Sequence, residues 1–160
     1  MIVLENAAIP DYQRAALAKG SVVVAPDQPV IAVEGPGAVD CLQGVLTNDV
    51  NAFGEQAFLY GAVLTPKGMI ECDLWTARES SERLEIYPAA QGLAALADVF
   101  RRFFPPRLAR TTDLTDRRAV LQVSGPDAAS SVQRAGFEHI ERRLMSAGAT
   151  QLITATRSPT

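Results

Sequence analysis

The sequence is poor in the residues that hold a fold together by covalent bonds or metal ions. Its 160 residues include two cysteines and one histidine. Cys41 and Cys72 form neither a CxxC pair nor a disulfide framework, and both lie in apolar segments. They are interpreted as buried free thiols, which fits a reducing compartment. His139 has no second nitrogen or sulfur ligand beside it, so we expect no metal site.

Long hydrophobic runs and an excess of positive charge are also absent. No apolar stretch approaches the length of a membrane span, and the first residues lack the pattern of a signal peptide. The net charge of −3 argues against a broad basic surface for nucleic acid. We interpret the one basic cluster as a solvated helix end; it consists of Arg101, Arg102, Arg107 and Arg110. We therefore expect a cytoplasmic protein with no membrane segment and no strong nucleic-acid surface.

What is present is a series of short apolar segments with two different periods. Alternating or continuous apolar runs predict strands, at 22–24, 30–33, 58–65, 69–77, 84–87, 120–123 and 151–154. Segments of helical period predict helices, at 12–19, 38–46, 93–104 and 126–135, with a helix-like stretch at 138–146. Pro66-Lys67-Gly68 predicts the turn of a β-hairpin, and Pro105 ends the longest helix.

One supersecondary unit occurs twice. Val30–Ala38 matches Val120–Ala128, and Gly35 and Gly125 are 90 residues apart (125 − 35). Each copy predicts a strand, a Gly-Pro corner and a helix. We interpret the corners as structural, because neither has the spacing of a phosphate-binding loop and each has proline where such a loop needs an amide donor.

The repeat predicts the fold class and the domain organisation. We expect an α+β fold, with an antiparallel sheet, helices on one face and repeated β-α-β units of the ferredoxin-like kind. The first unit is expected over residues 1–115. Residues 116–155 are expected to form the start of a second, incomplete unit, and residues 156–160 a flexible tail.

The strand predicted at 69–77 carries the candidate site. Period-two alternation places Glu71, Asp73 and Trp75 on one face, together with Met69. The other face is the core face and contains Ile70, Cys72, Leu74 and Thr76. Two interpretations of the carboxylate face stay open: the solvated side of a sheet, or the wall of a binding site with an aromatic ring for stacking. Tyr60, on the facing hairpin arm, can lie near this face.

Three segments resemble a known family over about residues 17–135. They are Gly44–Val50, Tyr60–Gly68 and Ile70–Leu74, and in this order they resemble the folate-binding domain of the glycine cleavage T-protein (aminomethyltransferase) superfamily. The Thr-Pro-Lys-Gly turn and the Leu-Thr-Asn-Asp helix end look most like its YgfZ branch. The resemblance implies tetrahydrofolate as the cofactor. Asp73 matches the carboxylate near the folate pteridine, and Tyr60 matches an aromatic position of the folate pocket, with Trp75 beside them.

The departures from the family pattern bear on function. T-proteins usually carry a second aspartate where this chain has Cys72, and proteins of the YgfZ branch also tend to lack that aspartate. The YgfZ motif Lys-Gly-Cys-Tyr-x-Gly-Gln-Glu and the carboxy-terminal barrel have no match here. We therefore expect the amino-terminal part of a YgfZ-like protein, acting in iron–sulfur cluster maintenance or tRNA modification and not a complete enzyme. A folate-dependent aminomethyltransferase is the alternative, and a folded fragment without a ligand is a third interpretation.

The incomplete second unit leads to two further expectations. A cofactor pocket normally encloses most of its ligand, so the chain alone is expected to bind folate weakly or not at all. Uncovered apolar surface on that unit favours a homo-oligomer.

Overall fold

The computed structural model describes residues 22–24, 27–52, 58–127, 130, 145–147 and 150–156. The chain divides into two compact units, one comprising Asp27–Ala119 with Ala155–Thr160 and the other Met1–Pro26 with Val120–Thr154. The helix expected at 12–19, most of the helix expected at 126–135 and the tail beyond Thr156 lie outside the described residues. In the part of the chain that is described, no helix has the length and apolar character needed to cross a membrane.

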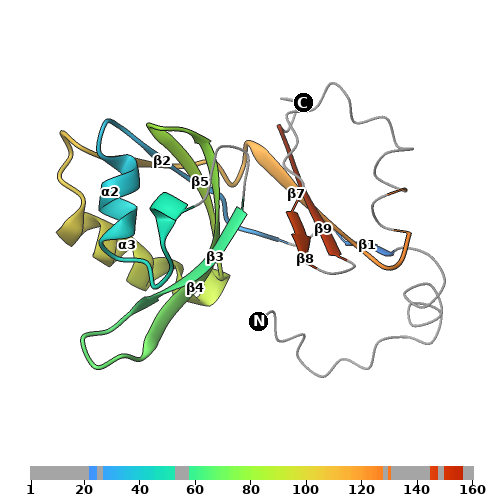
Figure 1. Cartoon of the computed structure of the whole chain (residues 1–160), viewed down its shortest axis with the longest axis horizontal. Coiled ribbons are helices and arrows are strands. Elements are labelled where there is room, and N and C mark those ends of the chain that lie inside the picture. Colours follow the sequence, from blue (N-terminus) through green and yellow to red (C-terminus); the bar gives the residue numbers. More distant parts are fainter. Residues whose placement is uncertain are drawn as a thin grey trace. The chain divides into compact units, whose positions relative to one another are not determined.

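The larger unit contains a five-stranded sheet in the order β3-β4-β5-β2-β6, in which all neighbours are antiparallel. Its strands are β2 (Ile31–Glu34), β3 (Phe58–Leu64), β4 (Ile70–Ser80), β5 (Arg83–Pro88) and β6 (Arg110–Asp113). Helices α2 (Ala38–Gln43) and α3 (Leu93–Phe103) cover one face (Figure 1), and two short 3-10 helices are present, η1 (Val50–Ala52) and η2 (Ala90–Gly92). The α+β fold with helices on one face of an antiparallel sheet is confirmed.

The core of this unit lies between the two helices and the sheet. Helix α3 buries Leu96 and Phe100 because they fall on one stripe of its helical period, and α2 buries Leu42. The sheet buries mainly branched and aliphatic side chains against them: Val33, Val63, Cys72, Leu74, Leu84 and Ile86. Helix α3 ends at Phe103, two residues before Pro105, as predicted.

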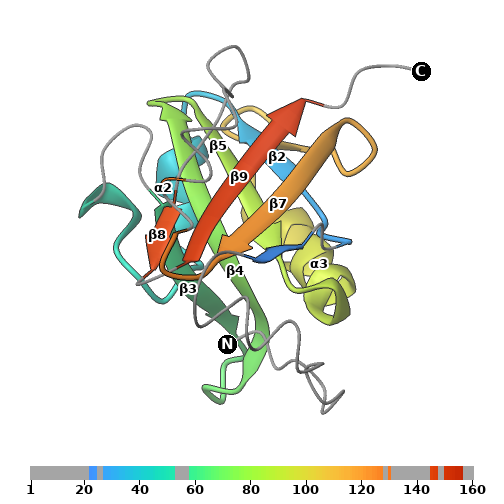
Figure 2. The same cartoon turned by 90° about the vertical axis from the view of Figure 1, so that its right-hand side faces the viewer.

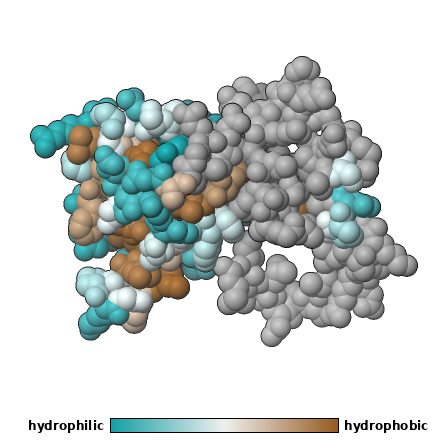
Figure 3. Space-filling model, in the orientation of Figure 1, coloured by the Kyte–Doolittle hydropathy of each residue, from teal (hydrophilic) through white to brown (hydrophobic). Residues whose placement is uncertain are grey.

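The β3–β4 hairpin is closed by the predicted turn. Thr65 N donates to Met69 O (2.8 Å), and Gly68 N donates to Thr65 O (2.9 Å). Gly68 has a φ of 79°, a left-handed conformation that glycine adopts without strain. Ile70 was predicted on the core face but is 67% exposed, because the register of β3 and β4 shifts between Val63 and Leu64. Ile70 therefore pairs with the exposed Leu64, and the alternation that buries Cys72 does not continue to it. Figure 3 shows apolar residues gathered over the lower part of the coloured unit, where this hairpin lies.

The two repeated corners share an unusual backbone conformation. Gly35, after β2, has a φ of 137°, and Gly125, after β7 (Arg118–Ser124), has a φ of 131°. A Cβ at Gly35 would lie 2.4 Å from Leu108 O, so the corner packs directly against another backbone segment. Gly35 N also donates to Glu82 O (2.9 Å). These contacts give the first corner a structural role.

The smaller unit has a sheet in the order β1-β7-β9-β8, with β7 and β9 side by side (Figure 2). Its other strands are β1 (Val22–Val24), β8 (Met145–Ala147) and β9 (Thr150–Thr156). The helix-like stretch expected at 138–146 is wrong at its end, because Met145 and Ser146 pair with β9 and so satisfy their backbone groups across strands.

Strand β6 of the larger unit was not predicted, because all four of its residues are exposed and it has no apolar alternation.

Candidate functional site

The three predicted site residues meet on the sheet face opposite the helices. Tyr60 in β3 lies directly across from Trp75 in β4, and their ring centroids are 4.9 Å apart with a tilt of 55°. The Tyr60 hydroxyl donates a 2.9 Å hydrogen bond to Oδ2 of Asp73. Tyr60 is 36% exposed, and Asp73 and Trp75 are half-buried. The face therefore presents two aromatic rings and a carboxylate that solvent can reach.

The loop after α2 fixes the position of β3. Asn48 Nδ2 donates to Tyr60 O (3.1 Å), and Thr47 Oγ1 accepts from Ala62 N (2.9 Å). Asn48 also accepts from the backbone of Asp49 (2.9 Å), as expected for a polar residue at a chain turn. The strand that carries Tyr60 is thus held by side chains from a segment more than ten residues earlier.

Burial raises the pKa values of two side chains of the β3–β4 hairpin, Tyr60 on the site face and Cys72 on the core face. Burial, followed by the hydrogen bond and negative charge of Asp73, raises the pKa of the Tyr60 hydroxyl. Tyr60 is therefore a protonated donor at neutral pH. Burial also raises the pKa of Cys72 to about 11, and its side chain packs against Gly92, where an added Cβ would lie 2.6 Å from the sulfur. Cys72 is therefore a protonated thiol on the core face of β4. Its neighbour Asp73 lies on the opposite, accessible face.

The same face continues into a buried charged cluster that the sequence analysis did not single out. Tyr87 lies across from Trp75, and its hydroxyl donates to Oε2 of Glu85 (2.9 Å). Glu85 is only 1% exposed, and Nη2 of Arg118 lies 2.6 Å from its Oε1. Strand alternation could have placed Glu85 and Tyr87 on one face, but no local signal links them to Arg118, 33 residues later.

The residues on this face suit a planar, polar heterocycle. Aromatic rings stack on flat ligands, and a carboxylate accepts hydrogen bonds from ring N–H and amino groups. Within the described ranges, no group of three or more histidine, cysteine, aspartate or glutamate side chains is arranged to hold a metal ion. The residue types of this face can hold a flat organic molecule by stacking and by hydrogen bonds to a carboxylate.

A solved structure with the same fold is the glycine cleavage system aminomethyltransferase T from Bartonella henselae. It is 21% identical to this chain, with a TM-score of 0.75, and the match covers 91% of this chain and 44% of that one. This chain thus spans less than half the length of that protein. A heterotetrameric sarcosine oxidase from Corynebacterium sp. U-96 matches with 15% identity and a TM-score of 0.49, over 91% of this chain and 82% of that one. No curated protein matches.

The family comparison covers most of the sequence. The model described as the GCVT N-terminal domain matches residues 28–155, which includes the entire five-stranded sheet and the Tyr60–Asp73 pair. The matched range is well over half of the chain. The chain therefore belongs to the GCVT N-terminal domain family, within the glycine cleavage T-protein superfamily.

Proposed function

We propose that the face formed by Tyr60, Asp73 and Trp75 binds the pterin ring of tetrahydrofolate or a folate derivative. The hydrogen bond from Tyr60 to Asp73 beside the Trp75 ring carries this proposal, because it aims a carboxylate along a face that also offers aromatic surface. A pterin has a flat ring for stacking and N–H donors for a carboxylate, so these residue types fit it. When bound, the folate would supply the atoms that accept or carry a one-carbon unit.

Within this proposal, the protein acts as a YgfZ-like cytoplasmic factor in iron–sulfur cluster maintenance or tRNA modification. Its own residues would then anchor folate without a transfer reaction. The support is the place of Cys72, where T-proteins usually carry a second aspartate. Its thiol is buried and its pKa is about 11, so only Asp73 of this pair presents a negative charge to the face. In this proposal Asp73 alone supplies the carboxylate that anchors the pterin.

A folate-dependent aminomethyltransferase is the second candidate. In that case Asp73 would stabilise a cationic amine or iminium as a C–N bond breaks, and would not serve only as a hydrogen-bond acceptor. The likeness of the fold to an aminomethyltransferase and the half-buried position of Asp73 favour it. An assay of methylene-tetrahydrofolate formation from an aminomethyl donor separates the two candidates, since only a transferase forms the product.

The described face forms one wall of the proposed site. Tyr60 is 36% exposed and Asp73 is half-buried, so water competes for each hydrogen bond that the Asp73 carboxylate can accept. We therefore expect weak binding by this chain alone, with a dissociation constant well above micromolar. Micromolar or tighter binding by a monomer would show that these residues already contain a complete site.

The test is a titration of the 160-residue chain with tetrahydrofolate up to millimolar concentration, followed by tryptophan fluorescence. Asp73→Asn should weaken binding roughly 10-fold or more, because a charge-assisted hydrogen bond becomes a neutral one. Glu71→Gln is the matched control, since Glu71 is a half-buried carboxylate of the same strand and also loses a charge, but it lies at the register shift of β4 and lines a pocket with Val99 and Phe103 on the helix side. Thermal melting should change little in either variant. Equal affinities of Asp73→Asn and the unaltered chain would refute the assignment.

A further inference from the structure

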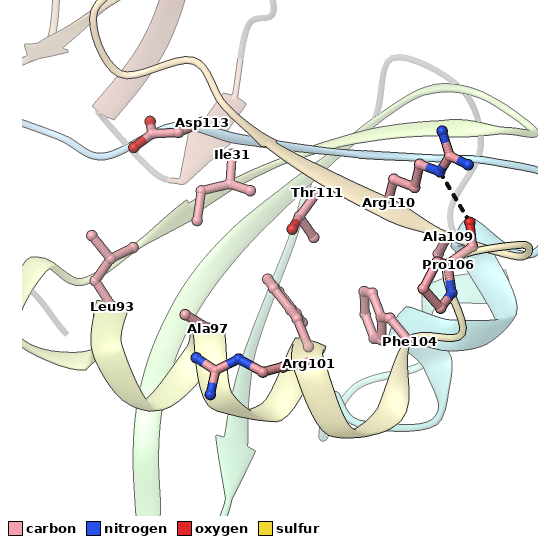
Figure 4. Close-up of a pocket in the computed structure, with 11 residues that line it drawn as sticks. Ile31, Leu93, Ala97, Arg101, Phe104, Pro106, Ala109, Arg110, Thr111 and Asp113 are labelled. Atoms are coloured by element: carbon pink, nitrogen blue, oxygen red, sulfur yellow. Dashed lines mark hydrogen bonds between the residues drawn. The ribbon is translucent and has the colours of Figure 1, made fainter.

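A groove lies on the other side of the larger unit, between helix α3 and strand β6 (Figure 4). We call it the α3–β6 groove, and it has a volume of about 770 Å³. It is lined by Ile31, Leu93, Ala97, Phe100, Arg101 and Phe104, and the far wall consists of Pro106, Ala109, Arg110, Thr111 and Asp113. It lies on the helix-covered side of the sheet, whereas Tyr60 and Asp73 lie on the opposite side. Any ligand of this groove is therefore distinct from the proposed folate.

The floor of the α3–β6 groove is apolar and well packed. Phe100 and Phe104 are buried below the surface, with their ring centroids 4.5 Å apart. Ala97 is exposed on α3, one turn before Arg101, and its small side chain leaves this part of the helix open toward β6. Ile31 and Leu93 are half-buried at the end where Asp113 lies. Apolar side chains of a ligand would find contact surface at Ala97, Leu93 and Ile31.

Strand β6 supplies a backbone edge along the same groove. Among the described strands it is the last in the sheet, and all four of its residues are exposed. Leu114 N donates to Val30 O (2.8 Å), and these residues continue the register of the β2–β6 pair. In an antiparallel ladder, successive residues direct their backbone N–H and C=O groups alternately toward the paired strand and away from it. The N–H and C=O groups of Thr111 and Asp113 therefore point away from β2, to the open edge. Such an edge is a template for a further strand.

The charges around the groove differ between its two ends. Arg101 lies on the α3 side with its side chain 75% exposed, and it pairs with Asp98 at 2.9 Å. An exposed pair of this kind is weak, so Arg101 can also pair with an incoming carboxylate. Asp113 lies at the far end of β6, away from Arg110 and Pro106 (Figure 4). The groove thus favours an acidic group near Arg101 and disfavours one near Asp113.

We propose that the α3–β6 groove binds an extended segment of a partner protein, which adds to β6 as a sixth strand. Its main chain would bond to the open edge at Thr111 and Asp113, and apolar side chains at alternate positions would rest on Ala97 and Leu93. An acidic side chain of the segment would pair with Arg101. A small amphipathic acid is less suited, because the rim of the groove is exposed and would not enclose it, and it would leave the β6 edge unused.

The test uses the full 160-residue chain and a phage-displayed library of random octapeptides. Selection should enrich peptides that alternate apolar and other residues and carry an acidic residue at one end. The tightest peptide is then synthesised and titrated against two matched variants, Ala97→Glu in the groove and Ala94→Glu on the exposed side of the same helix. Glutamate has a helix propensity close to that of alanine, so both variants should fold. Ala97→Glu should weaken binding about 10-fold or more, and Ala94→Glu should not change it.

Two further measurements complete the test. Arg101→Glu should weaken an acidic peptide at least about threefold, and replacement of the peptide's acidic residue by lysine should restore the loss. An N-methylated peptide should fail to bind, because it cannot pair with β6. No enrichment in the selection, or enriched peptides that are insensitive to Ala97→Glu, would overturn the proposal. A dimer in sizing measurements that Ala97→Glu dissociates would also overturn it, since the occupant would then be a second copy of this chain.

Discussion

The hydroxyl of Tyr60 reaches the carboxylate of Asp73 diagonally across the β3–β4 pair, at 2.9 Å. The residue directly opposite Tyr60 is Trp75, and Asp73 lies opposite Ala62. Diagonal neighbours on one sheet face come within reach only when a side chain is long, as tyrosine is. The small Ala62 side chain beside Asp73 leaves the space that the tyrosine ring crosses. A contact that joins two candidate ligand-binding groups thus depends on a third, small residue.

The first prediction concerns the titration of Tyr60. Its pKa is raised mainly by burial and further by Asp73, so Asp73→Asn should lower it toward, but not below, the ordinary tyrosine value. The measurement is a pH titration by NMR of tyrosine-labelled protein between pH 8 and about 12. Tyr87, the other described tyrosine, serves as an internal control. An unchanged Tyr60 titration in the variant would contradict the hydrogen bond.

The second prediction is a loss of stability at alkaline pH caused by Cys72. The pKa of Cys72 is about 11 in the folded chain, whereas an unperturbed thiol has a pKa of 9.0, so the folded state holds the proton more tightly. The stability that this thiol contributes is fully present below pH 9 and is lost as the pH rises toward 11, by up to about 3 kcal/mol. Urea unfolding at several pH values tests this.

The comparison for that experiment is Cys72→Ala. The variant should be less stable at neutral pH, because it loses buried volume, but its stability should fall less steeply between pH 9 and 11. Parallel pH profiles of the two proteins would show that Cys72 is not the group responsible.

The third prediction concerns the corner glycine. Gly35→Ala should destabilise the chain by about 2–4 kcal/mol, because alanine strains a φ of 137° and its Cβ would lie 2.4 Å from Leu108 O. Gly68→Ala is the matched control: its φ is also positive, at 79°, but nothing lies within 4 Å of the added Cβ. It should cost only about 1 kcal/mol. Chemical denaturation gives both values, and equal losses would remove the argument from close packing.

The fourth prediction concerns the buried Glu85–Arg118 pair. Glu85→Ala should cost about 3–5 kcal/mol, because the largely buried Arg118 loses its 2.6 Å partner and keeps the more distant Glu79 at 3.8 Å. Glu82→Ala, on an exposed residue next to the same strand, should change stability by less than about 0.5 kcal/mol. The double variant Glu85→Leu with Arg118→Leu should be more stable than Glu85→Ala alone. A double variant that is less stable than the single one would show that the pair itself, rather than the loss of one partner by Arg118, accounts for the cost.

Local sequence patterns determined most of the elements and the face that carries the candidate site. Period-two alternation in β4 placed Asp73 and Trp75 opposite the core residues Cys72 and Leu74, because strand geometry sends successive side chains to opposite faces. The hairpin turn and the end of α3 followed from glycine and proline, whose backbone restrictions act on their immediate neighbours.

Tertiary structure alone decided the features that depend on distant segments. Strand β6 exists because Arg110–Asp113 pairs with β2, and its exposed residues have no periodic pattern that would reveal it. Ile70 continues the apolar alternation of the β4 sequence but is exposed, because the register shift between Val63 and Leu64 interrupts the alternation in the folded hairpin. The Glu85–Arg118 pair and the α3–β6 groove likewise join residues far apart in the chain. Periodicity reports which side of an element is apolar, whereas the partner that covers that side is set only when the chain packs.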